Sequence, residues 1–356
     1  MRRSIALLSV LILAAAAQPI EHARAAEVPT LAQLIGQKLV VRMTGTTPSA
    51  GLLARAQAGE IGGVILFGWN VVSPEQVANL TAQLQAAAAA GGQPPLLIAT
   101  DQEGGSVKRI PWAPPTLSPP EMGAIGSATT ARQQGVATGQ TLVALGINCD
   151  LAPVADVPKS TASFMFQRGR TWSFDPKLTA TLSNAFASGL RQSGELPAMK
   201  HFPGIGRATR NTDSNVVTIY ATTATLAPGL KPYMAAIARG LPLIMLSNAT
   251  YTAYDPINAA GWSRAISKGL LRNQLGFRGV TITDSLSGTA KARAVPVASL
   301  AIKAAIAGTD MILVTNSESS TQATYTTLLA AASSGQIPRT RLVISYNRIL
   351  ALKASL

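Results

Sequence analysis

The chain has 356 residues, of which 47% are apolar and 13% are charged, and its formal net charge is +14. This composition excludes an intrinsically disordered chain, and the length suffices for one barrel-sized domain or two ordinary ones. The basic balance favours an acidic partner such as an anionic polysaccharide, a cell-wall polymer or a membrane surface, whereas nucleic acid is not predicted, because recognition motifs are lacking and aromatic residues make up only 5% of the chain.

The first residues have the pattern of an export signal. Arg2 and Arg3 precede the apolar run IALLSVLILAAAA, and Ala-Arg-Ala at 23–25 has the small-x-small form of a cleavage site. The run is too short to span a bilayer comfortably, although an uncleaved anchor is the alternative. We therefore expect an exported protein, periplasmic or secreted, with a signal peptide over 1–25 and a mature chain over 26–356. The paired arginines hint at the twin-arginine export route.

Short apolar runs, each bounded by Gly, Pro or a charged residue, recur along the rest of the chain. They predict eight strands, over residues 38–43, 62–68, 95–100, 146–152, 197–202, 242–248, 279–284 and 310–315. Cys149, the single cysteine, lies within the fourth run, where a buried inert thiol is expected rather than a nucleophile.

Helical patterns fill the intervals between these strands. Ser73 is expected to cap a helix with Pro74 at its first position and with Gln76 completing a capping box. Three leucine or valine positions then share one face of that helix: Val77, Leu80 and Leu84. Asp175 and Pro176 open a second helix, and a third ends at Gly240.

Eight alternations of an apolar strand with a helix favour a parallel α/β sheet covered by helices. In about 320 residues they match a closed (β/α)₈ TIM-like barrel in a single domain over 26–356. A doubly wound open sheet is the alternative, but the glycine-rich phosphate fingerprint of nucleotide-binding sheets does not follow the first strand.

In a barrel, the residues at the carboxyl ends of the strands build the site. The polar residues at these positions are Asp101, Asp150, Asp156, Lys200, His201, Asn248 and Asp284. Several carboxylates beside a lysine and a histidine suit a hydroxyl-rich ligand such as a sugar, whereas Asp150 and Asp156 near a proline-rich turn are interpreted as structural. His and Cys do not cluster as metal ligands do, so neither a metal nor an organic cofactor is expected.

Six motifs, in order, resemble glycoside hydrolase family 3, and most of all its single-barrel β-N-acetylhexosaminidases. From about residue 30 onward these are GGVILFGWNVVSPEQVANLT, DQEGGSVKR, INCDLAPVADV, GRTWSFDP, KHFPGIG with TDSN, and LLRNQLGFRGVTITDSLS. The resemblance implies a retaining mechanism in which one carboxylate attacks the anomeric carbon and a second group acts as acid and then base.

The resemblance also assigns residues to roles. Asp284 matches the nucleophile of the family, with a helix N-cap as the structural alternative. The residues that match the family's sugar-binding positions are Asp101, Arg109, Arg170, Lys200 and His201. Fixed charged partners give strong, oriented hydrogen bonds to sugar hydroxyls, although Arg109 could instead be a surface charge.

The chain departs from the family at the acid/base loop. The family has a histidine where this chain has Asn215, although the aspartate two positions earlier is kept as Asp213. Four further family residues are also replaced, at Ile205, Asn248, Ser285 and Ser106. Cleavage after Ala25 would remove three arginines and one glutamate, which lowers the net charge from +14 to +12 and leaves His201 as the only histidine. Asparagine has no proton to transfer near neutral pH.

Three functions remain open from the sequence. The first is an exported glycosidase that cleaves terminal β-linked N-acetylhexosamine from cell-wall or chitin-type glycans, with Asp213 or a partner or substrate group as the acid. The second is an inactive pseudo-hydrolase that binds glycans or peptidoglycan. The third and weakest is binding to nucleic acid or an anionic membrane through charge alone. The sequence does not indicate an oligomeric state.

Overall fold

The structure is a computed structural model that describes residues 29–356. The predicted signal peptide over 1–25 lies outside the described residues. Among the described residues, no helix combines the length and the apolar character needed to cross a membrane.

Eight parallel strands form the central sheet, and each corresponds to one of the eight predicted runs. They are β1 (Leu39–Arg42), β2 (Gly63–Leu66), β3 (Leu97–Thr100), β6 (Cys149–Asp150), β7 (Leu196–Phe202), β9 (Leu243–Leu246), β12 (Val280–Thr283) and β13 (Ile312–Val314). Almost every residue in them is buried, as expected for strands covered on both faces. The eight predicted strands are therefore confirmed, with shorter bounds for all of them except β7, which begins one residue earlier than predicted.

The order of the strands around the sheet identifies a barrel. The sheet runs β12-β9-β7-β6-β3-β2-β1-β13, so each strand pairs with its neighbours in chain order and β13 pairs with β1. A parallel bridge between Ile282 and Met311 joins β12 to the start of β13 and completes the ring. The predicted (β/α)₈ barrel is confirmed, and the doubly wound open sheet is excluded.

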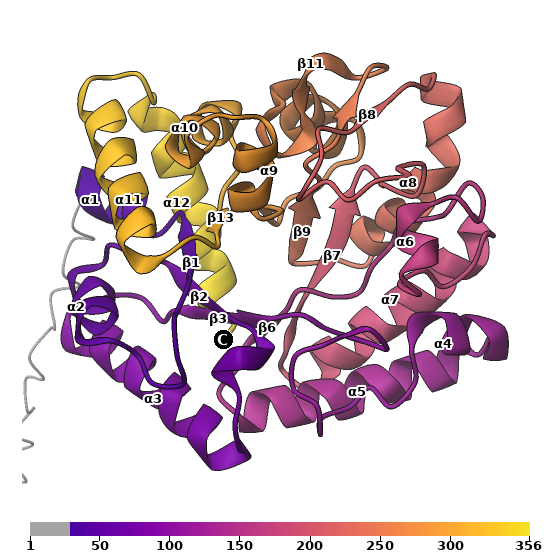
Figure 1. Ribbon diagram of the computed structural model, residues 1–356, viewed down its shortest axis with the longest axis horizontal. Coiled ribbons are helices and arrows are strands. Elements are labelled where there is room, and N and C mark those ends of the chain that lie inside the picture. The colour runs from indigo at the N-terminus through magenta and orange to yellow at the C-terminus, as the bar shows by residue number, and fades with distance from the viewer. Residues whose placement is uncertain (1–28) are drawn as a thin grey trace, which may run out of the picture.

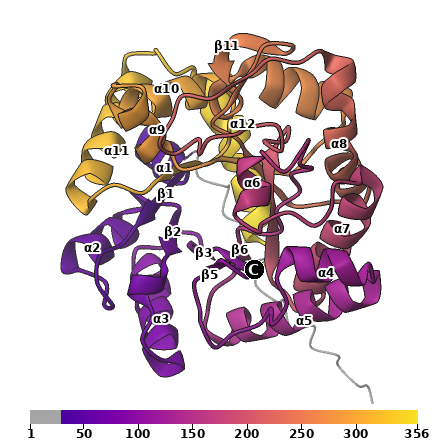
Figure 2. The same ribbon diagram turned by 45° about the vertical axis from the view of Figure 1, so that its right-hand side comes forward.

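Helices surround the strands in chain order, from indigo α2 and α3 to yellow α11 and α12 (Figure 1). The longer ones are α2 (Ala50–Ala58), α3 (Pro74–Ala90), α5 (Ala128–Ala144), α7 (Pro176–Gln192), α8 (Thr223–Ala238), α10 (Val297–Ala307), α11 (Glu318–Ser333), α12 (Arg339–Lys353) and the π-helical η3 (Ala265–Gln274). The last helices lie beside the first elements in both views (Figures 1 and 2), as the pairing of β13 with β1 requires.

Short elements occupy the loops. The helical ones are α1 (Leu31–Gly36), η1 (Gly68–Asn70), α4 (Pro119–Ile125), α6 (Phe164–Gln167), η2 (Ala260–Trp262) and α9 (Leu286–Ala292). The strands outside the barrel are β4 (Gln102–Gly104), β5 (Val107–Lys108), β8 (Thr218–Ile219), β10 (Thr250–Tyr251) and β11 (Asp255–Ala259).

The predicted helix starts are confirmed with one correction. Ser73 Oγ accepts a hydrogen bond from the Gln76 N–H at 3.2 Å, and Asp175 Oδ1 accepts one from the Lys177 N–H at 2.9 Å. The Gln76 side chain, however, does not complete a box with Ser73. Its Oε1 accepts from the Val72 N–H at 2.9 Å while its Nε2 donates to the Thr46 carbonyl at 2.6 Å, because the loop from β1 lies within reach of the helix start.

The C-terminal helix α12 packs against the interior of the barrel. Ile349 and Leu352 join one apolar cluster with interior residues of the strands such as Val40, Leu97 and Ala198. Lys353 Nζ donates to the Gly62 carbonyl, at the amino end of β2, at 2.7 Å. The amino end of the barrel interior is therefore covered by α12.

Candidate active site

A pocket of about 320 Å³ lies at the carboxyl ends of the barrel strands. Seven of the residues singled out from the sequence line it: Asp101, Arg109, Arg170, Lys200, His201, Asp213 and Asp284. They come from six different strand ends or loops, so the closed barrel brings them together. Apolar side chains of the barrel interior, Leu151, Met245 and Leu313, also line the pocket. The pocket therefore has charged walls and an apolar floor.

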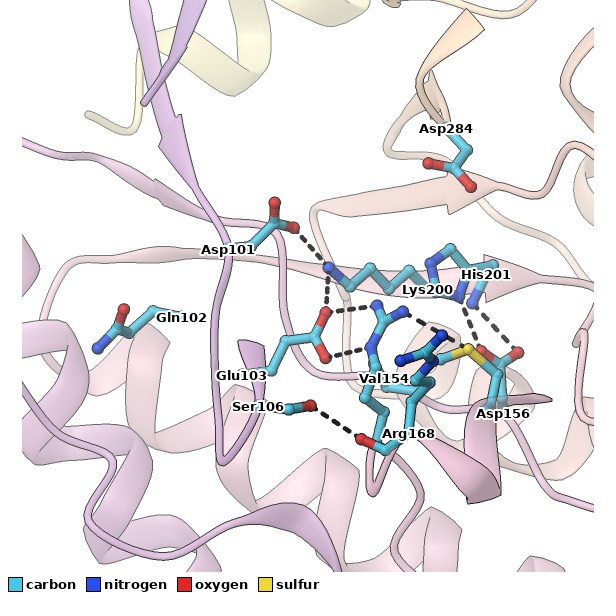
Figure 3. Close-up of polar contacts among 12 residues, drawn as sticks. Asp101, Gln102, Glu103, Ser106, Val154, Asp156, Arg168, Lys200, His201 and Asp284 are labelled. Atoms are coloured by element: carbon cyan, nitrogen blue, oxygen red, sulfur yellow. Dashed lines mark hydrogen bonds and ion pairs between the residues drawn. The ribbon is translucent and has the colours of Figure 1, made fainter. Parts of the chain in front are cut away.

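Lys200 is the centre of the charged wall (Figure 3). It lies at the end of β7, is 2% exposed, and its Nζ is 2.6 Å from both Asp101 Oδ1 and Glu103 Oε1. Burial alone would lower the pKa of Lys200, but the two carboxylates outweigh it and raise that pKa. The ammonium is therefore held in the charged form, which can donate to a ligand oxygen.

Glu103 is a site residue that the sequence reasoning missed. Arg170 binds its carboxylate in a bidentate manner, with Nε–Oε2 and Nη2–Oε1 distances of 2.8 and 2.7 Å. Burial acts to raise the pKa of Glu103, but Arg170 and Lys200 together hold it at about 2. The signal that could have revealed it is its spacing, since Glu103 lies two residues after Asp101 in a nearly extended segment.

Asp101 and Arg109 form the outer part of this wall. The Arg109 Nη2 lies 3.7 Å from Asp101 Oδ2, and the guanidinium stacks over the Phe67 ring at 5.6 Å from its centroid. Arg109 is therefore part of the pocket and not an isolated surface charge. One carboxylate oxygen of Asp101 pairs with Lys200 and the other lies near Arg109, so the carboxylate has a fixed orientation.

His201 is held by Asp156 at the back of the pocket (Figure 3). Its Nδ1 lies 2.7 Å from Asp156 Oδ2, and Asp156 Oδ1 accepts a hydrogen bond from the Ile205 N–H at 2.7 Å. Because the carboxylate accepts from Nδ1–H, the Nε2 side of the ring is left to meet a ligand. This contact agrees with the interpretation of Asp156 as structural, and gives it the specific role of orienting His201.

Asp284 follows β12 directly and points into the pocket region (Figure 3). Its Oδ1 accepts a hydrogen bond from the Ser285 N–H at 2.8 Å. The N-cap residue of α9 is Ser285, so the alternative interpretation of Asp284 as the N-cap of that helix is wrong. Because Asp284 directly follows the strand, its backbone position is fixed, as a catalytic nucleophile would require.

The loop that carries Asp213 and Asn215 presents only the first of them to the pocket. Asn215 Nδ2 donates to the Asn211 carbonyl at 3.1 Å, so its side chain holds the loop turn together. Asp213 lines the pocket, and its N–H donates to Asn211 Oδ1 at 3.0 Å. Burial within the pocket, and then the carboxylate of Asp284, raise the pKa of Asp213 to about 7. Asp213 is nevertheless exposed at the pocket mouth, where water reaches it.

The other replaced family positions lie differently around the pocket. Ile205 adds a buried apolar side chain to its wall, and Ser285 lines it with Oγ 2.6 Å from Thr315 Oγ1. Asn248 is buried and donates to the Ser285 carbonyl at 2.8 Å, so it supports the pocket from behind. Ser106 Oγ donates to the Arg168 carbonyl at 2.8 Å and tethers a neighbouring loop.

The remaining candidates are buried in the barrel. Cys149 is fully buried, and burial raises the pKa of its thiol well above the usual value, so the expected inert thiol is confirmed. Asp150 is also fully buried, and its Oδ1 accepts from the Gln102 N–H at 2.9 Å, directly behind Asp101.

The chain matches the model of the glycosyl hydrolase family 3 N-terminal domain over residues 30–352. It is 32% identical to a secreted glycosyl hydrolase of Arthroderma benhamiae, over 92% of this chain and 94% of that one. A beta-hexosaminidase of Nitrosomonas eutropha is 34% identical, over 82% of this chain and 84% of its own length.

Solved structures agree. The β-N-acetylhexosaminidase of Beutenbergia cavernae DSM 12333 superimposes with a TM-score of 0.85 at 35% identity, covering 92% of this chain and 99% of that one. A family 3 β-N-acetylglucosaminidase of Paenibacillus sp. gives a TM-score of 0.88 at 33% identity over 92% of this chain, which spans 63% of that longer protein. The chain therefore belongs to glycosyl hydrolase family 3.

Proposed function

We propose that this protein is an exported retaining glycosidase that removes terminal β-linked N-acetylhexosamine from cell-wall or chitin-type glycans. The single observation that carries the proposal is that two carboxyl groups, Asp284 and Asp213, line one pocket whose other wall is a fixed array of charged hydrogen-bonding groups. Relatives with beta-hexosaminidase and β-N-acetylglucosaminidase names support the choice of sugar.

Asp284 is the nucleophile in this proposal. Its carboxylate attacks the anomeric carbon and forms a glycosyl–enzyme ester as the bond to the leaving oxygen breaks. The lysine, arginine and histidine side chains around the pocket form hydrogen bonds with the hydroxyl groups of the bound sugar. Their carboxylate partners hold them in place: Asp101 pairs with Lys200, Glu103 with Arg170 and Asp156 with His201.

Asp213 takes the place of the missing histidine as acid and base. With a pKa of about 7 it carries its proton in about half of the molecules at neutral pH, and it gives that proton to the leaving oxygen. In the second step its carboxylate takes a proton from the water that attacks the glycosyl–enzyme. Its exposure at the pocket mouth supports this role, because that water has to arrive from solvent.

The shape of the pocket supports action on chain ends. Side chains of the barrel interior form its floor, so a sugar can enter from the mouth but a chain cannot thread through. Only the terminal residue of a glycan fits such a closed cup. Export would bring the enzyme to wall or chitin glycans, and rests on the signal-like pattern of the first 25 residues.

The test compares two substrates that differ in their need for an acid. Purified protein is assayed with 4-nitrophenyl N-acetyl-β-D-glucosaminide, whose leaving group needs little protonation, and with chitobiose, whose leaving group needs it. We expect turnover of both, loss of both in Asp284→Ala, and in Asp213→Asn a loss of about 10²–10⁴-fold on chitobiose with a smaller loss on the aryl substrate.

Other outcomes point to the alternatives. Equal losses of both substrates in Asp213→Asn would remove Asp213 as the acid. Turnover of neither substrate by the wild type, together with calorimetric binding of N-acetylglucosamine, would identify a glycan-binding pseudo-hydrolase. Activity that survives Asp284→Ala would exclude the whole assignment.

A further inference from the structure

A second cavity, of about 190 Å³, lies at the amino end of the barrel, opposite to the active-site pocket. Phe277 and Arg278 precede β12 there, while Ala307 and Gly308 precede β13, and η3 and α12 supply the other walls. The C-terminal helices α10 and α12 that border this end are seen in Figures 1 and 2. Of the residues that the structure describes, none lines both cavities.

The walls of this cavity are strongly basic. Five cationic side chains line it: Lys268, Arg272, Arg278, Arg341 and Arg348. The carboxylate that meets them is Asp310, which is fully buried, binds Arg272 through Oδ2 and lies 3.2 Å from Arg348 through Oδ1. One carboxylate thus faces five cations.

Asp310 does not also balance the charges of Lys268, Arg278 and Arg341. Its Oδ2 also accepts from the N–H and the Oγ1 of Thr281, at 2.9 and 3.0 Å, and its single negative charge is already shared between Arg272 and Arg348. Within residues 29–356, no carboxylate oxygen lies within 4.0 Å of Lys268, Arg278 or Arg341. Three cations therefore border the cavity without a counter-ion among the described residues.

The cations also crowd one another. Burial, and then Arg348 and Arg278, lower the pKa of Arg272 in spite of Asp310. Burial and the nearby Arg264 lower the pKa of Arg341. Like charges gathered at a cavity raise the free energy of the empty site, and an anion that entered it would relieve that repulsion.

Part of the site is rigid before any ligand arrives. Arg272 donates through Nη1 to the Gly279 carbonyl at 3.0 Å, and its guanidinium lies over the Phe277 ring at 5.5 Å from the centroid. The Gly308 Cα is close enough to Arg341 that an added Cβ would lie 3.6 Å from Nη1. A planar donor group already fixed in place loses little entropy when it binds an oxyanion.

We propose that this basic cavity binds a phosphate group. Several guanidinium groups suit the tetrahedral oxyanion better than a single carboxylate, because each can donate to a different oxygen. The volume accommodates a phosphate and part of the group that bears it, so the ligand is a phosphate ester, either a small soluble one or the headgroup of a phospholipid. The proposal does not depend on the proposed hydrolase activity, because the two cavities share no residue.

The test uses Arg278→Gln/Arg341→Gln, which removes two of the cations that lack a carboxylate partner. The matched control is Lys177→Gln/Lys231→Gln. Both lysines are exposed and lie outside the two cavities, and their replacement removes the same amount of charge. Titration calorimetry measures the binding of inorganic phosphate and glucose 1-phosphate at low ionic strength. Cosedimentation compares phosphatidylglycerol with phosphatidylcholine vesicles. Circular dichroism and thermal unfolding check that both variants fold.

We expect phosphate to bind the wild type and the control within twofold of each other, and the Arg278/Arg341 variant at least tenfold more weakly. Loss of glucose 1-phosphate binding in that variant indicates a soluble ligand, and loss of cosedimentation with phosphatidylglycerol indicates a headgroup. Absence of binding to any of the probes, equal binding by all three proteins, or an equal loss in the control would overturn the proposal, because each outcome removes the cavity as the cause.

Discussion

Gly288, in the first turn of α9, lies directly against the backbone of Asp213. A Cβ added at Gly288 would lie 2.4 Å from the Asp213 carbonyl oxygen and 3.2 Å from its Cβ. One residue further along, Thr289 Oγ1 donates to the Thr212 carbonyl at 3.0 Å. The helix that begins after Asp284, the proposed nucleophile, therefore fixes the loop that carries the proposed acid/base residue.

The first prediction concerns this contact. Gly288→Ala has to displace the backbone at Asp213, and we expect kcat on chitobiose to fall about tenfold to a hundredfold, since small misplacements of a catalytic group are costly. The aryl substrate should lose less. The matched control is Gly269→Ala, where an added Cβ meets nothing within 4 Å. Steady-state kinetics at one pH would contradict the prediction if both variants kept the wild-type kcat.

The second prediction is a pH profile. Asp213 is expected to act as acid in its protonated form, and its pKa of about 7 reflects burial and Asp284, opposed by His201 and Arg170. Above that pH the proton is lost, so kcat/KM for chitobiose should fall about tenfold per pH unit. The aryl substrate should show a shallower alkaline limb. Profiles with the same alkaline limb for both substrates would argue against an acid role for Asp213.

A third prediction concerns the family histidine. Asn215 supports the loop through Asn211 and does not line the pocket. Asn215→His should therefore change chitobiose turnover by less than about threefold, because an imidazole at this position of the present loop is not aimed at the leaving oxygen. The measurement is kcat at pH 6 for wild type and variant. A tenfold gain would mean that the loop can rearrange and that the asparagine alone limits the acid step.

The barrel could be predicted because each of its strands appears in the sequence as a short apolar run. The run 62–68 is apolar throughout and the run 242–248 is apolar up to Leu246, and a strand buried on both faces needs nothing else. The residues at strand ends then follow from topology, because the carboxyl ends of all eight strands meet at one rim. Asp101, Lys200 and Asp284 could therefore be expected to lie close together from their positions in the sequence alone.

Other features depend on contacts between distant segments and leave no local pattern. Glu103 becomes a site residue only because Lys200 and Arg170, far along the chain, meet it. Gly288 has an ordinary helical position whose importance comes from the loop that lies against it. The cations of the basic cavity are likewise spread over 268–348 and come together only because η3, the segment before β12 and α12 meet.

A fourth prediction tests the charged wall. Glu103→Gln leaves Lys200 and Arg170 buried without their shared carboxylate, which should lower the free energy of unfolding by about 3–5 kcal/mol. The control Glu60→Gln removes only one long contact, in which Glu60 lies 3.7 Å from Arg55, and should cost less than Glu103→Gln. Urea unfolding at pH 7 measures both, and equal midpoints for the two variants would count against the predicted asymmetry.

The stability that Glu103 gains from Lys200 and Arg170 should be lost in acid. The pKa of Glu103 falls from 4.5 to about 2 on folding, so the folded protein binds fewer protons than the unfolded chain in that interval. Its contribution is complete above pH 4.5 and is lost as the pH falls toward 2. The stability gap between wild type and Glu103→Gln should therefore narrow in acid.

The final prediction concerns Asp150, whose contribution to stability should fall as the pH rises, the opposite of Glu103. Its Oδ1 accepts from Gln102, but its Oδ2 is buried without a hydrogen-bond partner among the described residues. Burial outweighs the Gln102 bond and the attraction of Lys200, and raises the pKa of Asp150 from 3.8 to about 8. The folded protein therefore prefers the protonated form. The stability that this preference provides is complete below pH 3.8 and is lost as the pH rises through 8.

Asp150→Asn has the same shape, keeps an oxygen for Gln102 and cannot ionise. We expect the variant to gain stability relative to the wild type as the pH rises from 5 to 8, by at most about 1.4 kcal/mol per pH unit. Urea unfolding at four pH values measures this difference. Glu195 is present in both proteins, and burial, more than the charge of Asp150, raises its pKa. Parallel stability curves would mean that water or a local rearrangement already solvates Oδ2, because only a solvated carboxylate at this position could ionise without cost.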